Sequence, residues 1–291
     1  MKIALIGCGE VGHCYAQAWL AGGHELAGVC DLRQDPDMQA RVRGYGSTLH
    51  AEPGPWLGQA DLVVSAVFGR AALEVARQAL PHMRQDAAYA DLTTASAADM
   101  RAAAQAAARH GVPFTDVAIM GAIVLLGART PLLCAGSGAV DVAAFARGCG
   151  APAQAIEGEA GDAVRLKLLR SILTKGMESL AVECLVAAER MGLRDSLYEV
   201  LADIDRTPLT AFMDSFVRSH VLHAPRRLAE VREARDQLVE AGLQPLVLDG
   251  VERLFARTTQ GIEAARAAGA FDVPDTVPAR LAWLAPLARQ S

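Results

Sequence analysis

The stretch MKIALIGCGEVG (residues 1–12) decides the fold of this chain. Residues 3–6 form an apolar run that is too short for a helix and is followed by glycine, which predicts a buried β-strand. The spacing G-x-G-x-x-G follows directly, at Gly7, Gly9 and Gly12. The first glycine permits a tight turn, the second lets the backbone approach a pyrophosphate, and the third lets a helix pack close to the strand. The pattern predicts a dinucleotide-binding turn.

The residues after this turn continue the pattern. A helix is expected over residues 11–21, and its free N–H groups and positive dipole end would face the phosphates. Glu10 and Val11 therefore join the three glycines as predicted cofactor-binding residues. A Gly-Gly pair ends the helix, and the apolar run at residues 26–30 predicts a second strand.

The second strand ends in an acid, Asp31, which lies 31 − 12 = 19 residues after Gly12. A spacing of roughly 20 is typical of the acid that accepts hydrogen bonds from the adenosine ribose. This carboxylate would repel a ribose 2′-phosphate, so NAD is the first choice of cofactor. Arg33, Arg41 and Arg43 could clamp such a phosphate, which keeps NADP as the alternative and makes Arg33 a predicted cofactor-binding residue.

The rest of the chain divides into two regions. Further apolar runs predict strands at residues 61–67, 87–91, 112–119 and 131–135. Strands that alternate with helices predict an α/β domain with a Rossmann-type, doubly wound parallel sheet over residues 1–160. From residue 161 to 291 the pattern predicts an all-helical domain for substrate binding and dimerisation, with helices at 163–191, 195–205, 208–221, 224–241 and 245–268.

Ligands bind such sheets at the carboxyl ends of the strands. The residues at these ends, expected on one rim with the glycine turn, are Val67, Phe68, Thr93, Thr94, Met120 and Gly121. We expect the first three to contact the cofactor and Thr94 to bind the substrate. Thr93 and Thr94 have an alternative role, together with Ser96, as caps of the following helix.

Composition narrows the classes of function. The 291 residues are 52% hydrophobic but only 5% aromatic, which favours a helix-rich α/β protein. A net charge of −5 offers no basic face for nucleic acid. No apolar run reaches the roughly 18 residues of a membrane span, and no leader pattern precedes the first strand. The six cysteines form no CxxC pair, and no metal-ligand spacing is present, so we expect a cytoplasmic protein without a metal.

Four motifs together resemble the β-hydroxyacid dehydrogenase superfamily, which includes 3-hydroxyisobutyrate dehydrogenase, tartronate semialdehyde reductase and 6-phosphogluconate dehydrogenase. In chain order they are GCGEVG (7–12), DLTTAS (91–96), DVAIMGA (116–122) and GDAVRLKLLRS (161–171). They match the cofactor turn, an Asp-x-Ser-Thr segment, the substrate-lining Asp-Ala-Pro-Val-Ser-Gly-Gly segment, and the start of the helix that bears the catalytic lysine. The C-terminal region differs from the hydroxyisobutyrate type, so the chain resembles a divergent branch of the superfamily.

The resemblance implies roles for particular residues. Lys167 stands six residues after Gly161, which is the spacing of the family's catalytic lysine. The segment that would line the substrate pocket contributes Met120, Gly121 and Ala122, with Met120 in place of the family serine and Ala122 in place of its second glycine. Gly121 has a plain turn as its alternative role.

A polar stripe on the long predicted helix supports the assignment of Lys167. At 100° per residue, Ser171 lies 40° from Lys167, Glu178 lies 20° away and Lys175 lies 80° away. Ser171, which replaces the family asparagine, is expected to assist catalysis, and Lys175 to bind substrate. The alternative is an ordinary exposed stripe with a Lys175–Glu178 pair.

Two further residues are candidates in the helical region. Arg226, with Arg227, stands near the place of a family lysine that contacts the cofactor. An ordinary surface pair at the start of a helix is an equally good interpretation of these two arginines. His223 could reach the substrate, while packing or surface exposure is the commoner role of a lone histidine.

These observations predict an NAD(P)-dependent oxidoreductase that transfers hydride between the nicotinamide and a small β-hydroxyacid or a related alcohol/carbonyl pair. Lys167 would be the general acid/base. One alternative is C=N reduction, as in the related imine reductases, which lack the lysine. The other is a non-catalytic dinucleotide sensor. The many leucines and alanines of residues 163–291 also predict a homodimer through that region.

Overall fold

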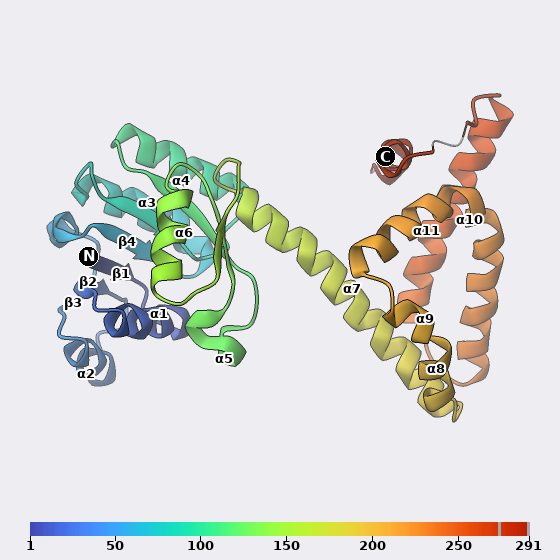
Figure 1. The fold of residues 1–291 in the computed structure, drawn as a ribbon, viewed down its shortest axis with the longest axis horizontal. Helices are drawn as coiled ribbons and strands as arrows, with labels where there is room; N and C mark the ends of the chain where they lie inside the picture. The colour runs from blue at the N-terminus through green and yellow to red at the C-terminus, as the bar shows by residue number, and fades with distance from the viewer. Residues whose placement is uncertain (273–274, 290–291) are drawn as a thin grey trace. The chain divides into compact units, whose positions relative to one another are not determined.

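The computed structural model describes residues 1–272 and 275–289 (Figure 1). Its sheet has eight strands in the order β3-β2-β1-β4-β5-β6-β7-β8. Their bounds are β1 Lys2–Ile6, β2 Glu25–Cys30, β3 Leu49–His50, β4 Leu62–Ser65, β5 Ala88–Asp91, β6 Phe114–Ile119, β7 Leu132–Ala135 and β8 Ala153–Ala155. The order changes direction at β1, as a doubly wound sheet requires, and the predicted fold class is confirmed.

One strand departs from the predicted parallel arrangement: β7 runs antiparallel to β6. A parallel return needs a crossover of a dozen or more residues, usually a helix. The connection over residues 120–131 holds only the four-residue helix α5 (Ile123–Leu126) and a short 3₁₀ turn. The chain therefore turns back beside β6, and the parallel order resumes only when α6 (Ala139–Gly148) carries it from β7 to β8.

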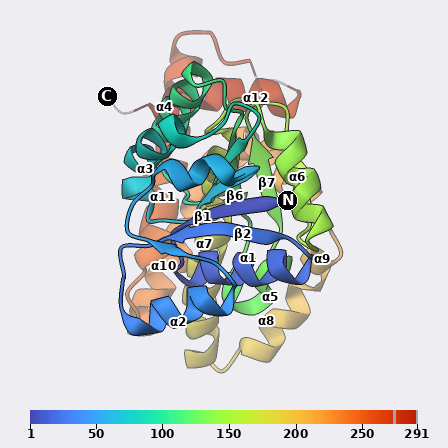
Figure 2. The ribbon, with the colours of Figure 1, turned by 90° about the vertical axis from the view of Figure 1, so that its left-hand side faces the viewer.

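Helices cover both faces of the sheet (Figure 2). Successive side chains of β1 point to opposite faces of the sheet, so both faces are apolar. Ile3 and Leu5 belong to a first buried cluster, and Ala4 and Ile6 belong to a second cluster on the other face. The first cluster receives α1 (Glu10–Ala21), α2 (Pro36–Gly44) and α6; the second receives α3 (Ala72–Ala79), α4 (Ala97–Arg109) and the first turn of α7 (Asp162–Arg190). Short 3₁₀ helices complete the chain at Pro55–Gln59, Gly69–Ala71, Leu80–His82, Gly127–Arg129 and Pro286–Ala288.

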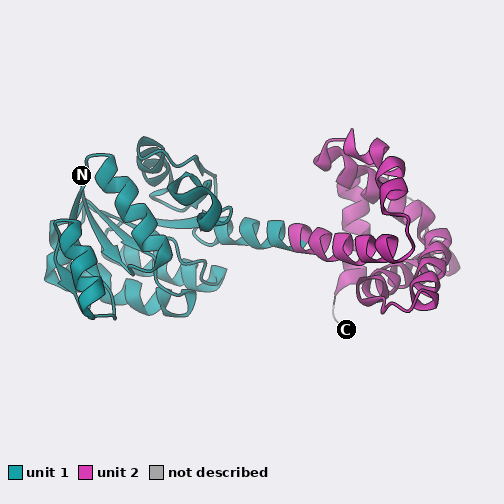
Figure 3. Ribbon diagram, turned by 90° about the horizontal axis from the view of Figure 1, so that it is seen from below, with its two compact units in different colours: residues 1–172 teal, residues 173–291 magenta. Residues whose placement is uncertain are grey.

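The chain divides into two compact units, Met1–Ile172 and Leu173–Ser291 (Figure 3). Among its described residues, the second unit contains the end of α7 and five further α-helices, which are α8 Arg194–Val200, α9 Ala202–Asp205, α10 Leu209–Glu240, α11 Leu246–Ala267 and α12 Val277–Leu284. Within residues 1–272 and 275–289, no helix combines the length and hydropathy needed to cross a membrane.

Two helix predictions were wrong in the second unit. The helix expected over residues 195–205 is divided into α8 and α9. The helices expected at 208–221 and 224–241 are the single helix α10, with Pro225 in its interior. A proline there removes one backbone hydrogen bond and costs about 3 kcal/mol. Burial of Val221, Ala224 and Leu228 offsets that cost, so packing keeps the helix continuous.

Candidate active site

The glycine turn has the geometry that its spacing predicts. Gly7 adopts φ +92°, and a Cβ there would lie 2.7 Å from the carbonyl oxygen of Ala66. A Cβ on Gly12 would lie only 2.0 Å from the carbonyl oxygen of Gly7, so α1 packs against the turn without room for a side chain. Gly9 begins α1 as its N-cap and has no atom within 4 Å of its Cβ position. The backbone at Gly9 is therefore open to an approaching group, and a helix N-terminus with free N–H groups suits a pyrophosphate.

Asp31 lies at the end of β2, beside this turn. Its carboxylate accepts the Cys8 N–H at 2.8 Å and the Arg33 N–H at 2.9 Å, and it pairs with Arg33 Nε at 3.3 Å. Burial alone would raise the pKa of Asp31, but the hydrogen bonds from Arg33 and Cys8 outweigh burial and hold the pKa below its ordinary value. Asp31 is therefore an anion at neutral pH.

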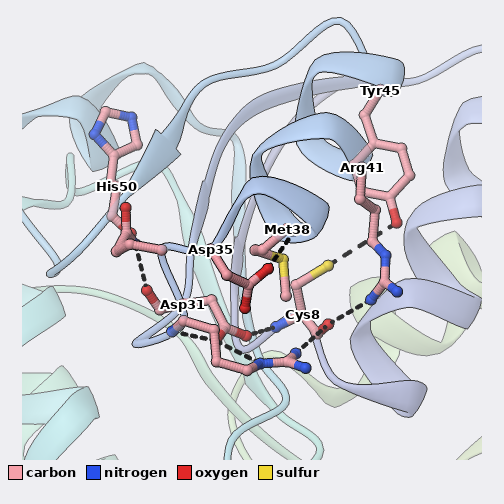
Figure 4. Close-up of polar contacts among 9 residues, drawn as sticks. Cys8, Asp31, Asp35, Met38, Arg41, Tyr45 and His50 are labelled. Carbon is pink, nitrogen blue, oxygen red and sulfur yellow. Dashed lines mark hydrogen bonds and ion pairs between the residues drawn. The ribbon is translucent and has the colours of Figure 1, made fainter.

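Two guanidinium groups converge beside Asp31 (Figure 4). Arg33 Nη2 and Arg41 Nη1 donate to the Cys8 carbonyl oxygen at 3.1 and 3.4 Å. Tyr45 contacts the Cys8 thiol at 3.9 Å and also hydrogen-bonds to the ring of His13. The predicted ribose position is thus bordered by both the acid that favours NAD and the arginines that favour NADP.

A second group of predicted residues lines a cavity of about 260 Å³ at the carboxyl ends of β4, β5 and β6. The predicted residues in its lining are Val11, Val67, Thr93, Thr94, Gly121 and Lys167. Lys167 Nζ donates to Thr94 Oγ1 at 2.8 Å, across 73 residues of sequence. The first unit therefore brings together residues from all four motifs around one cavity.

Burial changes the proton affinity of this lysine. Burial lowers the pKa of Lys167 below the ordinary lysine value, and the negative charge of Asp116 partly opposes that effect. A lowered pKa increases the fraction of free amine near neutral pH. Lys167 is thus suited to accept and donate a proton.

The threonines next to the cavity do not cap α4. Ser96 does so, because its hydroxyl accepts the N–H of Asp99 at 3.1 Å. Thr93 Oγ1 instead donates to Asp91 at 2.6 Å, while Thr94 accepts from Lys167. The capping role proposed for these two threonines is therefore wrong.

Other predicted residues lie outside the lining of this cavity. Phe68, in the turn that follows β4, is 79% exposed, and the Arg70 guanidinium lies 5.8 Å from its ring centre. Met120 offers its carbonyl oxygen to Arg170 Nη1 at 3.0 Å, and Ala122 is exposed at the start of α5. Ser171 lies on α7, one turn beyond Lys167. The functional roles of these residues stay predictions.

Three predicted residues belong to the second unit, which are Lys175, His223 and Arg226. Arg226 pairs with Glu230 at 2.6 Å on the same helix, as a surface residue does. The neighbouring Arg227 donates to Ser219 at 3.0 Å. Contact of the second unit with cofactor or substrate stays a prediction.

Sequence reasoning missed two buried acids next to the cavity, Asp91 and Asp116, which are 0% and 1% exposed. Both stand inside motifs that were recognised, but no role followed from the letters alone. Their signal is an acid within an otherwise apolar strand, since Asp91 ends β5 and Asp116 lies inside β6.

Comparison with known proteins agrees with this geometry. Residues 2–143 match the family described as the NAD binding domain of 6-phosphogluconate dehydrogenase. Residues 188–258 match a domain of unknown function, DUF1932. The predicted resemblance and the predicted dinucleotide cofactor are thereby confirmed, and the chain has the fold of an NAD(P)-dependent oxidoreductase.

Individual proteins resemble the chain over nearly its full length. A 28.5 kDa protein encoded in the 7S RNA 5′ region of Methanothermus fervidus is 24% identical over 88% of this chain and 98% of its own. A solved protein with reported structural similarity to 3-hydroxyacid dehydrogenases is 29% identical, with a TM-score of 0.61 over 89% of this chain and 97% of its own. An imine reductase variant from Myxococcus stipitatus, in complex with NAD+, is 18% identical, with a TM-score of 0.74 over 96% and 99%, and shows the shared fold alone.

The glycine turn yields a matched pair of variants. Gly12→Ala forces a methyl group onto a backbone oxygen, so we expect a loss of stability of about 1–3 kcal/mol and a loss of NADH binding. Gly9→Ala places its methyl group in open space with an allowed backbone conformation, φ −70° and ψ −160°. Its stability should change by less than about 0.5 kcal/mol, while NADH affinity falls tenfold or more, roughly 1.4 kcal/mol.

Thermal denaturation and fluorescence titration with NADH measure the two effects separately. Wild-type affinity in Gly9→Ala would show that no pyrophosphate lies against this turn.

Proposed function

We propose that this protein is an NAD(P)-dependent oxidoreductase that acts on a small β-hydroxyacid or a related alcohol/carbonyl pair, with Lys167 as general acid/base. The observation that carries the proposal is the hydrogen bond of Lys167 Nζ to Thr94 in the cavity beside the glycine turn. That cavity lies where ligands bind on a doubly wound sheet.

The chemistry requires a proton carrier beside the hydride donor or acceptor. A bound nicotinamide supplies hydride transfer to or from the carbon of the substrate. In the oxidative direction, the free amine of Lys167 accepts the hydroxyl proton as the carbonyl forms. In the reductive direction, the ammonium group donates that proton to the forming alkoxide. Thr94 orients Nζ through its hydroxyl, and partial burial keeps the amine form accessible.

The two alternatives, imine reduction and dinucleotide sensing, give Lys167 a different role. Imine reduction places the proton on nitrogen, and the imine reductases that share this fold are too distant in sequence to decide the bond. A dinucleotide sensor would bind cofactor without turnover and would not need a partly buried amine. The lowered pKa of Lys167 and its hydrogen bond to Thr94 favour catalysis on a C–O bond.

We infer that NAD is the preferred cofactor, because the Asp31 anion would stand next to a ribose 2′-phosphate. Arg33 is already paired with Asp31, which reduces its attraction for a phosphate. Arg41 remains the main attraction for the 2′-phosphate of NADP.

We also propose a homodimer formed through the helical unit. Large apolar side chains are exposed on α7, α8 and α10, among them Val182, Tyr198, Val200 and Phe216, each more than half exposed. A cavity of about 480 Å³ with a mostly apolar lining lies between α7, α8, α10 and α11 in the same unit. Large apolar side chains that gather on exposed helix faces are typical of an interaction surface, and a second copy of the chain would offer the same surface in return.

Cofactor preference tests the role of Asp31. Wild-type protein should bind NADH more tightly than NADPH in fluorescence titrations. Asp31→Ser should narrow the gap, because the substitution removes the repelling charge and frees Arg33 for a phosphate. Arg109→Ser, an exposed change in the last turn of α4, serves as the control and should leave the ratio unaltered. A wild-type preference for NADPH would mean that Arg33 and Arg41 outweigh Asp31.

Light scattering on the full chain tests the dimer. We expect a mass twice the chain mass of 30.6 kDa at micromolar concentration. Val200→Lys should shift the protein toward monomer, because it places a charge on an apolar contact surface. A monomeric wild-type protein would contradict the proposal.

Lys167→Met tests the catalytic role. Methionine suits a helix and retains most of the side-chain volume, so folding and NADH affinity should be nearly unchanged. Turnover should fall by about 10² to 10⁴, the usual contribution of a positioned acid–base group. Arg165→Met on the same helix, where the arginine is exposed and paired with Asp162, should retain activity.

The assay begins with a panel of 3-hydroxyacids and their semialdehydes. If Lys167→Met keeps more than about a tenth of wild-type turnover, the lysine is not the acid/base. Turnover of cyclic imines without turnover of any hydroxyacid would favour the C=N alternative.

A further inference from the structure

Two buried carboxylates lie next to each other below the candidate cavity. Asp91 on β5 and Asp116 on β6 are paired in the parallel register of the two strands, so their side chains project from the same face. Each has one carboxylate oxygen with a partner and one without, counted over the described residues. A buried carboxylate oxygen without a hydrogen-bond partner costs folding free energy, so its presence calls for an explanation.

Asp116 holds the first turn of α7 against the sheet. Its Oδ2 accepts the N–H of Gly161 at 2.9 Å and the N–H of Val164 at 3.1 Å, which lie 45 and 48 residues away in sequence. The first N–H groups of a helix have no partner within the helix, and a carboxylate there also complements the helix dipole. The turn before the helix is tightly held, because Gly161 has φ +102° and its Cβ position lies 2.8 Å from the Ala97 carbonyl oxygen.

Asp91 holds the loop that carries Thr94. Its Oδ1 accepts both the N–H and the hydroxyl of Thr93, at 2.8 and 2.6 Å. Thr94 follows in a left-handed conformation, φ +57°, which a non-glycine residue keeps only when its surroundings impose it. The two partners of the Lys167–Thr94 hydrogen bond are therefore each fixed by a buried carboxylate.

We propose that Asp116 is a positioning residue for Lys167, which fixes the helix turn that precedes the lysine and places a negative charge near its ammonium group. The importance of this position rests on the proposed function, in which Lys167 transfers a proton. Lys167 follows Val164 by three residues, so a shift of the first turn of α7 moves Nζ relative to Thr94.

Burial and the nearby negative charge have opposite effects on the pKa of Lys167. Burial lowers the pKa of Lys167 and the charge of Asp116 raises it. Burial raises the pKa of Asp91 to about 6, with a smaller contribution from the charge of Asp116. Burial also raises the pKa of Asp116, with a smaller contribution from the charge of Asp162. Tyr89 and Cys134 are the other titratable groups within reach of the two carboxylates. Removal of the Asp116 charge should therefore increase the amine form of Lys167.

Asp116→Asn tests the proposal in the full chain without a substrate. Asparagine keeps an oxygen that can accept from Gly161 and Val164, but it removes the charge. The rate at which Lys167 reacts with acetic anhydride is followed from pH 6 to pH 10 by mass spectrometry of its peptide. We expect the midpoint to move to lower pH and the rate at pH 7 to rise roughly threefold or more, since one pKa unit changes the amine fraction tenfold. Asp162→Asn, an equivalent change at the same helix start, should leave the midpoint unaltered.

A folded Asp116→Asn variant with the wild-type midpoint would overturn the proposal. If the variant does not fold, a second measurement uses the wild-type protein. It follows hydrogen exchange of the backbone N–H groups of residues 161–164. The protection of these N–H groups relative to their intrinsic exchange rate should be high at neutral pH and should fall in acid as Asp116 becomes protonated; exchange at the intrinsic rate at neutral pH would overturn the proposal.

The labelling result is independent of the proposed reaction. If Lys167→Met retains turnover, the proposed function fails while the shifted midpoint in Asp116→Asn still shows the positioning effect. If Lys167→Met inactivates the enzyme and Asp116→Asn behaves as wild type, only the positioning proposal fails. With a substrate in hand, the pH profile of kcat/KM in Asp116→Asn should shift in the same direction as the labelling profile.

Discussion

The close approach of α1 to the end of β1 is the constraint on which the rest of the structure depends. The missing Cβ of Gly12 lets the helix meet the Gly7 carbonyl, and this contact aims the helix N-terminus at the open space over Gly9. Two sites are arranged around that end, with Asp31, Arg33 and Arg41 on one side and the cavity of Lys167 and Thr94 on the other. A dinucleotide is long enough to reach both, because its pyrophosphate lies between its two nucleosides.

The fold could be predicted where local pattern and tertiary packing agree. The strands of the doubly wound sheet are apolar runs bounded by turns, so their positions followed from the residues. The direction of β7 did not follow, because direction depends on whether the connection over residues 120–131 can cross the sheet. The continuity of α10 did not follow either, because the local preference of Pro225 to end a helix is outweighed by packing that the residues alone do not show.

The site divides in the same way. The cofactor-binding residues Gly7, Gly9, Gly12 and Asp31 could be predicted because they lie in one continuous segment of the sequence. The family resemblance gave Lys167 and Thr94 separate places in the site, but their contact did not follow, since no rule of spacing joins residues 73 positions apart. Asp116 was missed as a support for α7 because its partners are backbone N–H groups, which every sequence offers equally. Supporting contacts of this kind become visible only when the strands and helices are placed.

The central claim is that a dinucleotide spans the glycine turn with its nicotinamide beside Lys167. A crystal structure of the protein with NADH tests this most directly. The account predicts the pyrophosphate against the N–H groups at the start of α1, the adenosine ribose at Asp31, and the nicotinamide ring in the cavity lined by Thr93, Thr94 and Lys167. A nicotinamide ring outside that cavity, or a pyrophosphate that does not contact the glycine turn, would contradict it.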